Sequence, residues 1–325
     1  MFKLMKDGVK KFFRGNSTLR GTLHNVSESS PVKAAIASLY VLPVRNILEP
    51  PYSNKNQRKR EFLHKYTFTV SSEYYREIHG LLHVSEAEGH ELVRVGRDND
   101  GGYIMLDDLP GGIAYSFGIS GDVSWDKAMA SRGYDVYMYD HTIDGLPEKN
   151  PRFHWSKLGI GDGSGKDDKL KTLEEYITRN GHEGQRDMIL KMDVEGAEWG
   201  FLESVKPEIL AQFSQMSFEF QGMNKADICG KIPVLLRKIN ETHKLVHLHG
   251  QNWGFYVCTG GKTFCNQIEV TYVRKDKYRF NDDYDVSLPT DIDMPAITYI
   301  PDVSLGFWNR NIQDDDKKFT LITVG

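Results

Sequence analysis

The sequence has no long apolar run and no excess of positive charge. No stretch of its 325 residues approaches the roughly 18 consecutive apolar residues that a membrane-spanning helix needs. Its 41 Lys and Arg against 45 Asp and Glu leave a net charge of -4, which gives nucleic acid no global attraction. An integral membrane protein and a nucleic-acid-binding protein are therefore both disfavoured.

Cysteine is also scarce, and internal repeats and low-complexity tracts are missing. The three cysteines, Cys229, Cys258 and Cys265, cannot all pair, and no two have the CxxC spacing of zinc ligands. We interpret them as reduced thiols that pack inside a cytoplasmic protein.

The length and the 39% hydrophobic content suit one main domain with an extension. We assign residues 1–75 to a helical N-terminal extension and residues 76–325 to the main domain. Residues 1–15 combine apolar residues at helical spacing with lysines on other faces, which predicts a basic amphipathic helix. That helix packs on its own domain or on a second copy in a homo-oligomer; the alternative is peripheral contact with a membrane surface.

From Leu92 onward, strand and helix patterns alternate. The Asn-Asp-Gly-Gly sequence at 99–102 predicts a hairpin between strands at 92–95 and 103–106. Further strands are expected at 113–117, 135–139, 153–158, 188–192, 216–220, 245–248 and 268–273, with helices at 124–132, 170–177, 199–205 and 234–242. This order predicts an α/β fold, a Rossmann-like doubly wound and mainly parallel sheet.

Ligands of such a sheet bind at the carboxyl ends of its strands. The first informative end is a turn that contains Gly118, Ser120, Gly121 and Asp122, followed by Ser124 as the expected N-cap of a helix. Because a valine replaces the third glycine of G-x-G-x-x-G, a nicotinamide dinucleotide is disfavoured.

Two further strand ends carry polar residues. Asp140 follows its strand at the spacing where a carboxylate accepts hydrogen bonds from ribose hydroxyls, although a surface turn would also explain it. Together with the glycine turn, Asp140 favours an adenosine-type ligand. A third, glycine-rich turn from Gly159 to Asp162 could pass along an adenine ring or be an ordinary loop.

The strongest signal follows the strand at 188–192. Asp193, Glu195 and Glu198 lie within one turn, where three carboxylates would repel each other if desolvated. Packing alone explains them poorly; the competing interpretation is a set of solvated acids at a helix start.

These residues resemble a known family. Lys-Met-Asp-Val-Glu-Gly-Ala-Glu at 191–198 is similar to the signature of FkbM-like methyltransferases, a class I family that depends on S-adenosylmethionine (SAM). Thr-Leu-Glu-Glu-Tyr at 172–176, and the 99–103 hairpin with Tyr-Ser-Phe-Gly at 115–118, also resemble that family or a related group; the resemblance covers residues 90–300.

The resemblance implies a role for each strand end. Gly118, Ser120 and Gly121, with Asp122 in the same turn, would lie beside the methionine part of SAM. Asp140 would hold the ribose, the Gly159–Asp162 turn the adenine, and Asp193 would lie beside the sulfonium and the acceptor. The turn reads Gly-Ile-Ser-Gly, with serine where many class I enzymes have glycine.

The family commonly methylates sugar or glycan hydroxyls, which are weak acids and need a base or a metal to lose their proton. We predict Asp193, Glu219 and His249 for this role, acting directly or through Mg²⁺ or Mn²⁺; His247 is more typical of a structural residue. Two alternatives remain: a glycosyltransferase whose metal-binding D-x-D is Asp291-Ile292-Asp293, and a SAM-binding scaffold without turnover.

Overall fold

The computed structural model describes residues 72–312 and 320–324. The predicted helix at 1–15 and the rest of the extension before residue 72 lie outside these described residues. Within the described part, no helix has both the length and the apolar character needed to cross a bilayer.

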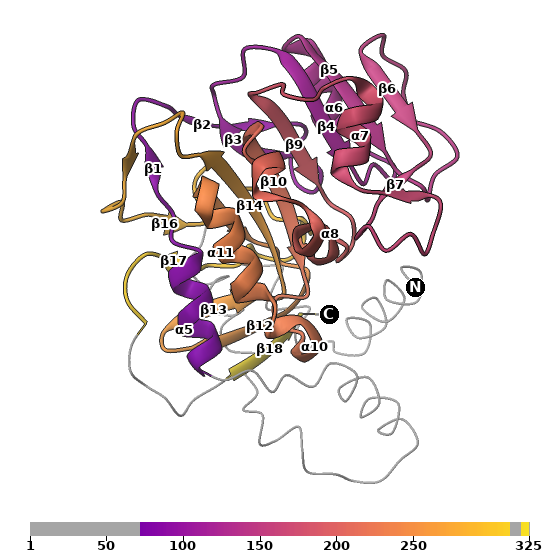
Figure 1. The fold of residues 1–325 in the computed structure, drawn as a ribbon. Helices are drawn as coiled ribbons and strands as arrows, with labels where there is room; N and C mark the ends of the chain where they lie inside the picture. The colour runs from indigo at the N-terminus through magenta and orange to yellow at the C-terminus, as the bar shows by residue number, and fades with distance from the viewer. Residues whose placement is uncertain (1–71, 313–319, 325) are drawn as a thin grey trace, which may run out of the picture.

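A seven-stranded mixed sheet forms the centre of the molecule (Figure 1). Six strands run in one direction, and β14 runs antiparallel to both of its neighbours, which confirms the expected α/β class with a mainly parallel sheet. The strand order is β6 (Phe153–Ser156), β5 (Tyr134–Tyr139), β4 (Gly112–Phe117), β9 (Met188–Met192), β10 (Phe213–Gln221), β14 (Gln267–Arg274) and β11 (His243–Gly250).

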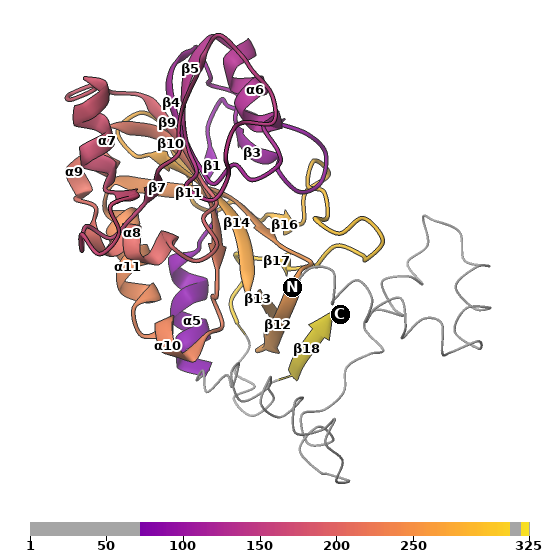
Figure 2. The ribbon, with the colours of Figure 1, turned by 90° about the vertical axis from the view of Figure 1, so that its right-hand side faces the viewer.

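Helices cover both faces of the sheet, unequally (Figure 2). Helix α6 (Ser124–Ser131) lies on one face, next to the hairpin of β2 (Leu92–Val95) and β3 (Tyr103–Leu106). The opposite face carries the other helices: α5 (Ser72–Leu81), α7 (Leu173–Asn180), α8 (Glu198–Ser204), α9 (Pro207–Leu210), α10 (Ala226–Cys229) and α11 (Ile232–Thr242).

Two predicted boundaries need correction. Helix α5 spans the boundary that was placed between residues 75 and 76, and its Tyr74, Tyr75 and Ile78 are buried in the main core, so the domain already includes residue 72. The helix predicted over 170–177 begins at Leu173, because β8 (Leu170–Lys171) first pairs with β7 (Gly159–Ile160) and the helix is capped after that pair.

Short strand pairs complete the fold. One three-stranded sheet contains β12 (Gly254–Thr259), β13 (Lys262–Cys265) and β18 (Thr320–Val324), and β1 (Glu86–Ala87) pairs with β15 (Phe280–Asn281). Strands β16 (Ser287–Leu288) and β17 (Gly306–Phe307) pair and close the base of an intervening loop. We call this loop, residues 289–305, the covering loop.

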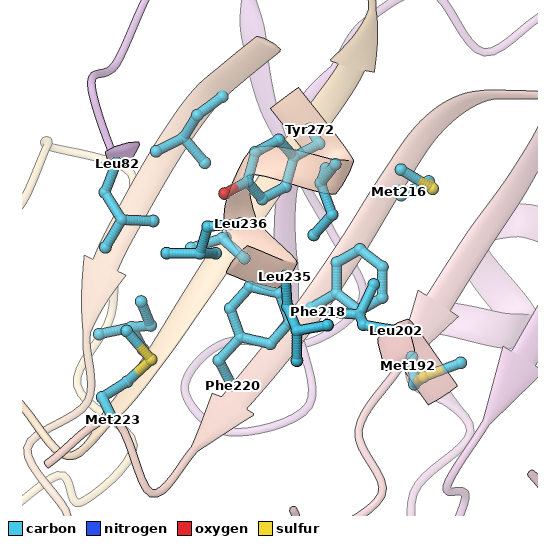
Figure 3. Packing of buried hydrophobic residues seen from close by; sticks show 14 of the residues in the cluster. Leu82, Met192, Leu202, Met216, Phe218, Phe220, Met223, Leu235, Leu236 and Tyr272 are labelled. Carbon is cyan, nitrogen blue, oxygen red and sulfur yellow. The ribbon is translucent and has the colours of Figure 1, made fainter. Parts of the chain in front are cut away.

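The face of the sheet that carries α5, α7, α8 and α11 is apolar, and we call it the helix-covered face. Phe218 and Phe220 from β10 stack with ring centroids 5.0 Å apart, and Leu202, Leu235 and Leu236 from α8 and α11 pack over them (Figure 3). Because side chains alternate along a strand, every second residue of β9, β10 and β14 joins this core. The residues between them must project to the other face, where the site residues lie.

Candidate functional site

The loops after β4 and β9 touch at the middle of the sheet. The Asp193 N–H donates to the Phe117 carbonyl over 3.0 Å, and Gly118 has a φ of 78°. A Cβ at Gly118 would lie 1.6 Å from the Asp193 carbonyl oxygen, so only glycine allows this contact. Strands β5 and β6 lie to one side of this junction and β10 to the other; it is therefore the point where the strand order reverses.

Asp140 fixes the loop after β4. Its Oδ2 accepts from the N–H groups of Ile119 and Ser120 at 3.0 and 2.9 Å, and its Oδ1 accepts from the N–H and hydroxyl of Thr142 at 2.8 and 2.6 Å. Burial opposes ionisation, but these hydrogen bonds hold the pKa of Asp140 below its usual value. All four acceptor positions of the carboxylate are thus engaged, and a ribose contact by Asp140 stays a prediction.

Asp122 binds the first residue of helix α6, Ser124, which was expected to be the N-cap. Its Oδ1 accepts from the N–H and hydroxyl of Ser124 at 3.0 and 2.6 Å, and its Oδ2 lies 2.9 Å from the guanidinium of Arg97. Ser124 is the first residue of the helix rather than its N-cap, a position that Val123 occupies without a side-chain bond. Gly121 is exposed, and an added Cβ there would have open space around it.

The third predicted turn lies beside the loop after β5. Gly159 is buried, and a Cβ there would lie 2.4 Å from His141 Nδ1. Asp162 is exposed, and its Oδ1 accepts from the N–H of Ser164 at 2.9 Å. The structure thus brings Gly159 next to the residue after Asp140, while Asp162 faces solvent.

Polar side chains form two rows across the face opposite the main core. The register of β10, β14 and β11 places Glu219, Glu269 and His249 side by side, and Asp193 follows the Met192–Phe218 pair in line with them. We call these four residues the acidic row. One pleat back, the same strands align a second polar row: Ser116, Lys191, Ser217, Thr271 and His247. This alignment cannot be read from the order of residues in the chain, because it arises only when the strands pair in this register.

The β2–β3 hairpin covers these rows. The Tyr103 hydroxyl donates to Asp193 Oδ2 over 3.2 Å, and the Lys191 ammonium lies 5.6 Å from the Tyr103 ring centroid. Thr271 donates to the Ile104 carbonyl and shares a 3.0 Å hydrogen bond with Ser217. The hairpin signature found in the sequence thus supplies a direct partner of Asp193.

The carboxyl groups around the junction hold their protons unusually well. Burial raises the pKa of Glu219 well above its usual value, and the neighbouring Asp193 and Glu269 carboxylates raise it further. Burial also raises the pKa of Asp193, and it raises that of Glu198 to about 8. Glu219 Oε1 accepts from the amides of Gln221 and Gln267 at 3.1 and 3.3 Å. A group with such a raised pKa is a stronger base than an ordinary carboxylate once it has lost its proton.

Both ring nitrogens of His249 already have carboxylate partners, and its predicted role as a base or metal ligand stays a prediction. His249 is fully buried, with Nδ1 at 3.2 Å from Glu269 and Nε2 at 3.0 Å from Asp302. Burial alone would lower its pKa, but the Asp302 and Glu269 carboxylates raise the pKa to about 10. Near neutral pH His249 is therefore a cation held between two carboxylates.

The covering loop uses Asp293 of the candidate D-x-D in a buried ion pair. Asp293 lies 3.0 Å from His247 Nε2 and accepts from the N–H and hydroxyl of Thr290, whereas Asp291 is exposed. Burial opposes ionisation of Asp293, but the His247 pair lowers its pKa. Among the described residues, no group of three or more His, Cys, Asp or Glu side chains is placed to hold a metal ion.

Glu269 and Asp302 are site residues that the sequence analysis did not select. Glu269 had a detectable signal: Gln267, Glu269 and Thr271 alternate with apolar residues, which is the pattern of a strand with one polar face. Asp302 lies in an irregular loop and had no such signal. Its partner, His249, is 53 residues away in the chain.

Comparisons with known proteins assign no family. No family model matches the chain, and no curated protein is similar to it. Among solved structures, a Streptococcus thermophilus protein with the provisional description of a hemolysin gives a TM-score of 0.32 at 10% sequence identity, covering 74% of this chain and 90% of that one. Agreement this slight carries no conclusion about fold or function.

Proposed function

We propose that the protein is a SAM-dependent O-methyltransferase with a Rossmann-like, class I fold, acting on a hydroxyl of a sugar, glycan or glycoconjugate. The observation that carries the proposal is the junction of Gly118 with Asp193 at the point where the strand order reverses. The residues at this junction belong to the two stretches that resemble FkbM-like methyltransferases.

The residues at the junction suit the chemistry of SAM. Its sulfonium cation is compatible with the carboxylates of Asp193 and Glu195, and Gly121 leaves space on the outer side of the loop. Ser120 has a φ of 50°, a conformation that Asp140 stabilises by binding two consecutive N–H groups of the loop. Gly118, Ser120, Gly121 and Asp122 would flank the methionine part, with Asp140 and the Gly159–Asp162 turn toward the nucleoside.

One carboxylate of the Asp193–Glu219 pair, in its ionised form, would accept the proton of the acceptor hydroxyl. When bound, SAM supplies a methyl group by in-line displacement, so the protein contributes orientation and a base. Burial and mutual repulsion make these two carboxylates hold protons as a coupled pair, and Tyr103 orients one of them through its hydroxyl. A direct base thus replaces His249 in our mechanism, and dependence on Mg²⁺ or Mn²⁺ stays a prediction.

Calorimetry tests the cofactor first. We expect SAM to bind and a uridine diphosphate sugar not to bind; the reverse result would favour the glycosyltransferase alternative. Transfer of tritium from methyl-labelled SAM to a panel of methyl glycosides then tests turnover, and SAM binding without any transfer would favour the scaffold. Glu219→Gln should lower the rate by about 10²–10⁴-fold with little change in SAM affinity.

The remaining assignments form part of the same proposal. A glycan acceptor, a cytoplasmic location, peripheral membrane contact through residues 1–15 and homo-oligomerisation all await measurement. Cosedimentation of the full chain and of a chain lacking residues 1–15 with anionic vesicles tests the membrane contact: equal pelleting of the two would remove it.

A further inference from the structure

The acidic row continues into the covering loop at one end and reaches the proposed base at the other. Glu219 faces Glu269 across β10 and β14, and Glu269 faces His249 across β14 and β11. Asp302 of the covering loop then contacts the far side of the His249 ring. Four side chains thus form one continuous line, three from neighbouring strands and one from the covering loop: Glu219, Glu269, His249 and Asp302.

We propose that His249 is a positioning residue, clamped by Asp302 of the covering loop, that sets the protonation of Glu219 through the Glu269 carboxylate between them. This inference rests on the proposed function for its catalytic meaning. Its physical basis is the order of charges along the line, in which an imidazolium separates two carboxylates and the third carboxyl group is the base.

The contacts of Glu269 fix the orientation of its carboxylate between His249 and Glu219. Its Oε2 lies 3.2 Å from His249 Nδ1, and its Oε1 accepts a short hydrogen bond from the Gln251 amide. Both oxygens are thus held, so Glu269 keeps a fixed orientation toward Glu219. Without the imidazolium, Glu219 and Glu269 would be two adjacent buried carboxyl groups, which hold protons more tightly than one carboxyl beside an ion pair.

The covering loop is anchored on this face by hydrogen bonds as well as by Asp302. The Asn252 amide donates to the carbonyls of Ile297 and Ile300 at 2.9 and 3.0 Å, and Asn99 of the β2–β3 hairpin donates to the Pro295 carbonyl at 3.0 Å. These bonds fix the loop to both elements that border the acidic row. The position of Asp302, and with it the charge of His249, therefore depends on the loop being closed.

Other charged groups also face the line, and the test must separate them. Around Glu219 these are Asp193, Glu198 and Asp100, with the Tyr103 hydroxyl; around His249 the additional group is Asp293. None of them changes in the variants below. A shift at Glu219 caused by a change at His249 or Glu269 therefore reports the proposed line.

The experiment is a carboxyl ¹³C NMR titration of glutamate-labelled full-length protein, with the Glu219 signal assigned through Glu219→Gln. His249→Gln should raise the titration midpoint of Glu219 by about one pH unit or more, because the cation that balances the Glu269 charge is lost. Glu269→Gln should lower it by a similar amount, because a like charge is lost. Asp291→Asn, an exposed carboxylate on the same loop, is the matched control and should leave the midpoint unchanged.

Where His249→Gln does not fold, Glu269→Gln with its opposite expected sign keeps the inference falsifiable. An unchanged midpoint in Glu269→Gln, or equal shifts in Asp291→Asn, would overturn it. Because the titration needs no acceptor, it is independent of the proposed function. In the transfer assay with methyl glycosides, His249→Gln should move the acidic limb of the kcat profile to higher pH; a loss of rate equal at every pH would instead indicate a purely structural role.

Discussion

The two faces of the central sheet are built from the same strands, but one buries apolar side chains and the other also buries acids. On the helix-covered face, Met192, Phe218 and Val270 pack against apolar helices, and burial alone stabilises them. On the opposite face, their neighbours in the chain are Asp193, Glu219 and Glu269, whose burial is costly unless each finds a partner or a proton. The opposite face has a core of its own beside α6, but along β9, β10 and β14 the buried polar groups gather on that face.

The largest expected difference between buried acids and buried apolar side chains is in how the free energy of unfolding depends on pH. Glu198 has its folded pKa raised from 4.5 to about 8, so the folded chain binds more protons than the unfolded chain between these values. Its contribution to stability is therefore present below pH 4.5 and is lost as the pH rises through 8, by up to about 5 kcal/mol. Urea unfolding of Glu198→Gln should show a flatter pH dependence than wild type. Glu195→Gln, an exposed acid in the same turn, should not.

Phe218→Ala tests the buried hydrocarbon of the helix-covered face. It removes a fully buried ring and should lower the free energy of unfolding by about 4 kcal/mol. Because no charge is involved, the loss should be the same at pH 5 and pH 8 in urea titrations. A strongly pH-dependent loss would mean that the two faces are coupled and would break the comparison.

Gly118→Ala tests the junction where the loops meet. The added methyl would collide with the Asp193 backbone in a backbone conformation that suits glycine, and the expected loss is about 3 kcal/mol. Gly121→Ala is the matched control, three residues away with open space, and should change stability little. Thermal unfolding of both variants measures this difference; equal losses of stability would show that the two loops can move apart.

Asp140→Ala distinguishes two roles of Asp140: fixing the loop after β4, and binding the ribose of SAM. Loss of the carboxylate leaves the N–H groups of Ile119 and Ser120 without their partner, and we expect a loss of about 2 kcal/mol in stability. SAM affinity, measured by calorimetry, should fall by about 1–3 kcal/mol. Stability lost with affinity kept would confine Asp140 to shaping the loop.

The apolar face was the more predictable from sequence. The strands at 113–117, 135–139 and 188–192 carry dense apolar runs between turns, and the structure confirms them within a residue or two. The loops that carry Gly118, Asp140 and Asp193 do lie together, because parallel strands bring their carboxyl ends to one edge whatever the connections.

The partners of those residues could not be predicted. Whether His249 is a base or a clamped cation depends on Asp302, which reaches it through a loop without periodicity. Whether Asp140 is free depends on how Ile119 and Ser120 orient their N–H groups, which in turn depends on the positive φ of Ser120. Sequence patterns indicate which groups are near the site, and only the folded backbone determines which of them are already engaged.

The two ends of the covering loop meet at one pair of short strands. Strands β16 and β17 hold its two ends side by side through the pairs Ser287–Phe307 and Leu288–Gly306. With the ends fixed, doubling the length of such a loop costs only about 0.6 kcal/mol of closure entropy. Residues inserted between its anchoring positions should therefore leave the sheet beneath intact, whereas loss of Asp293 or Asp302 would remove a carboxylate partner of His247 or His249.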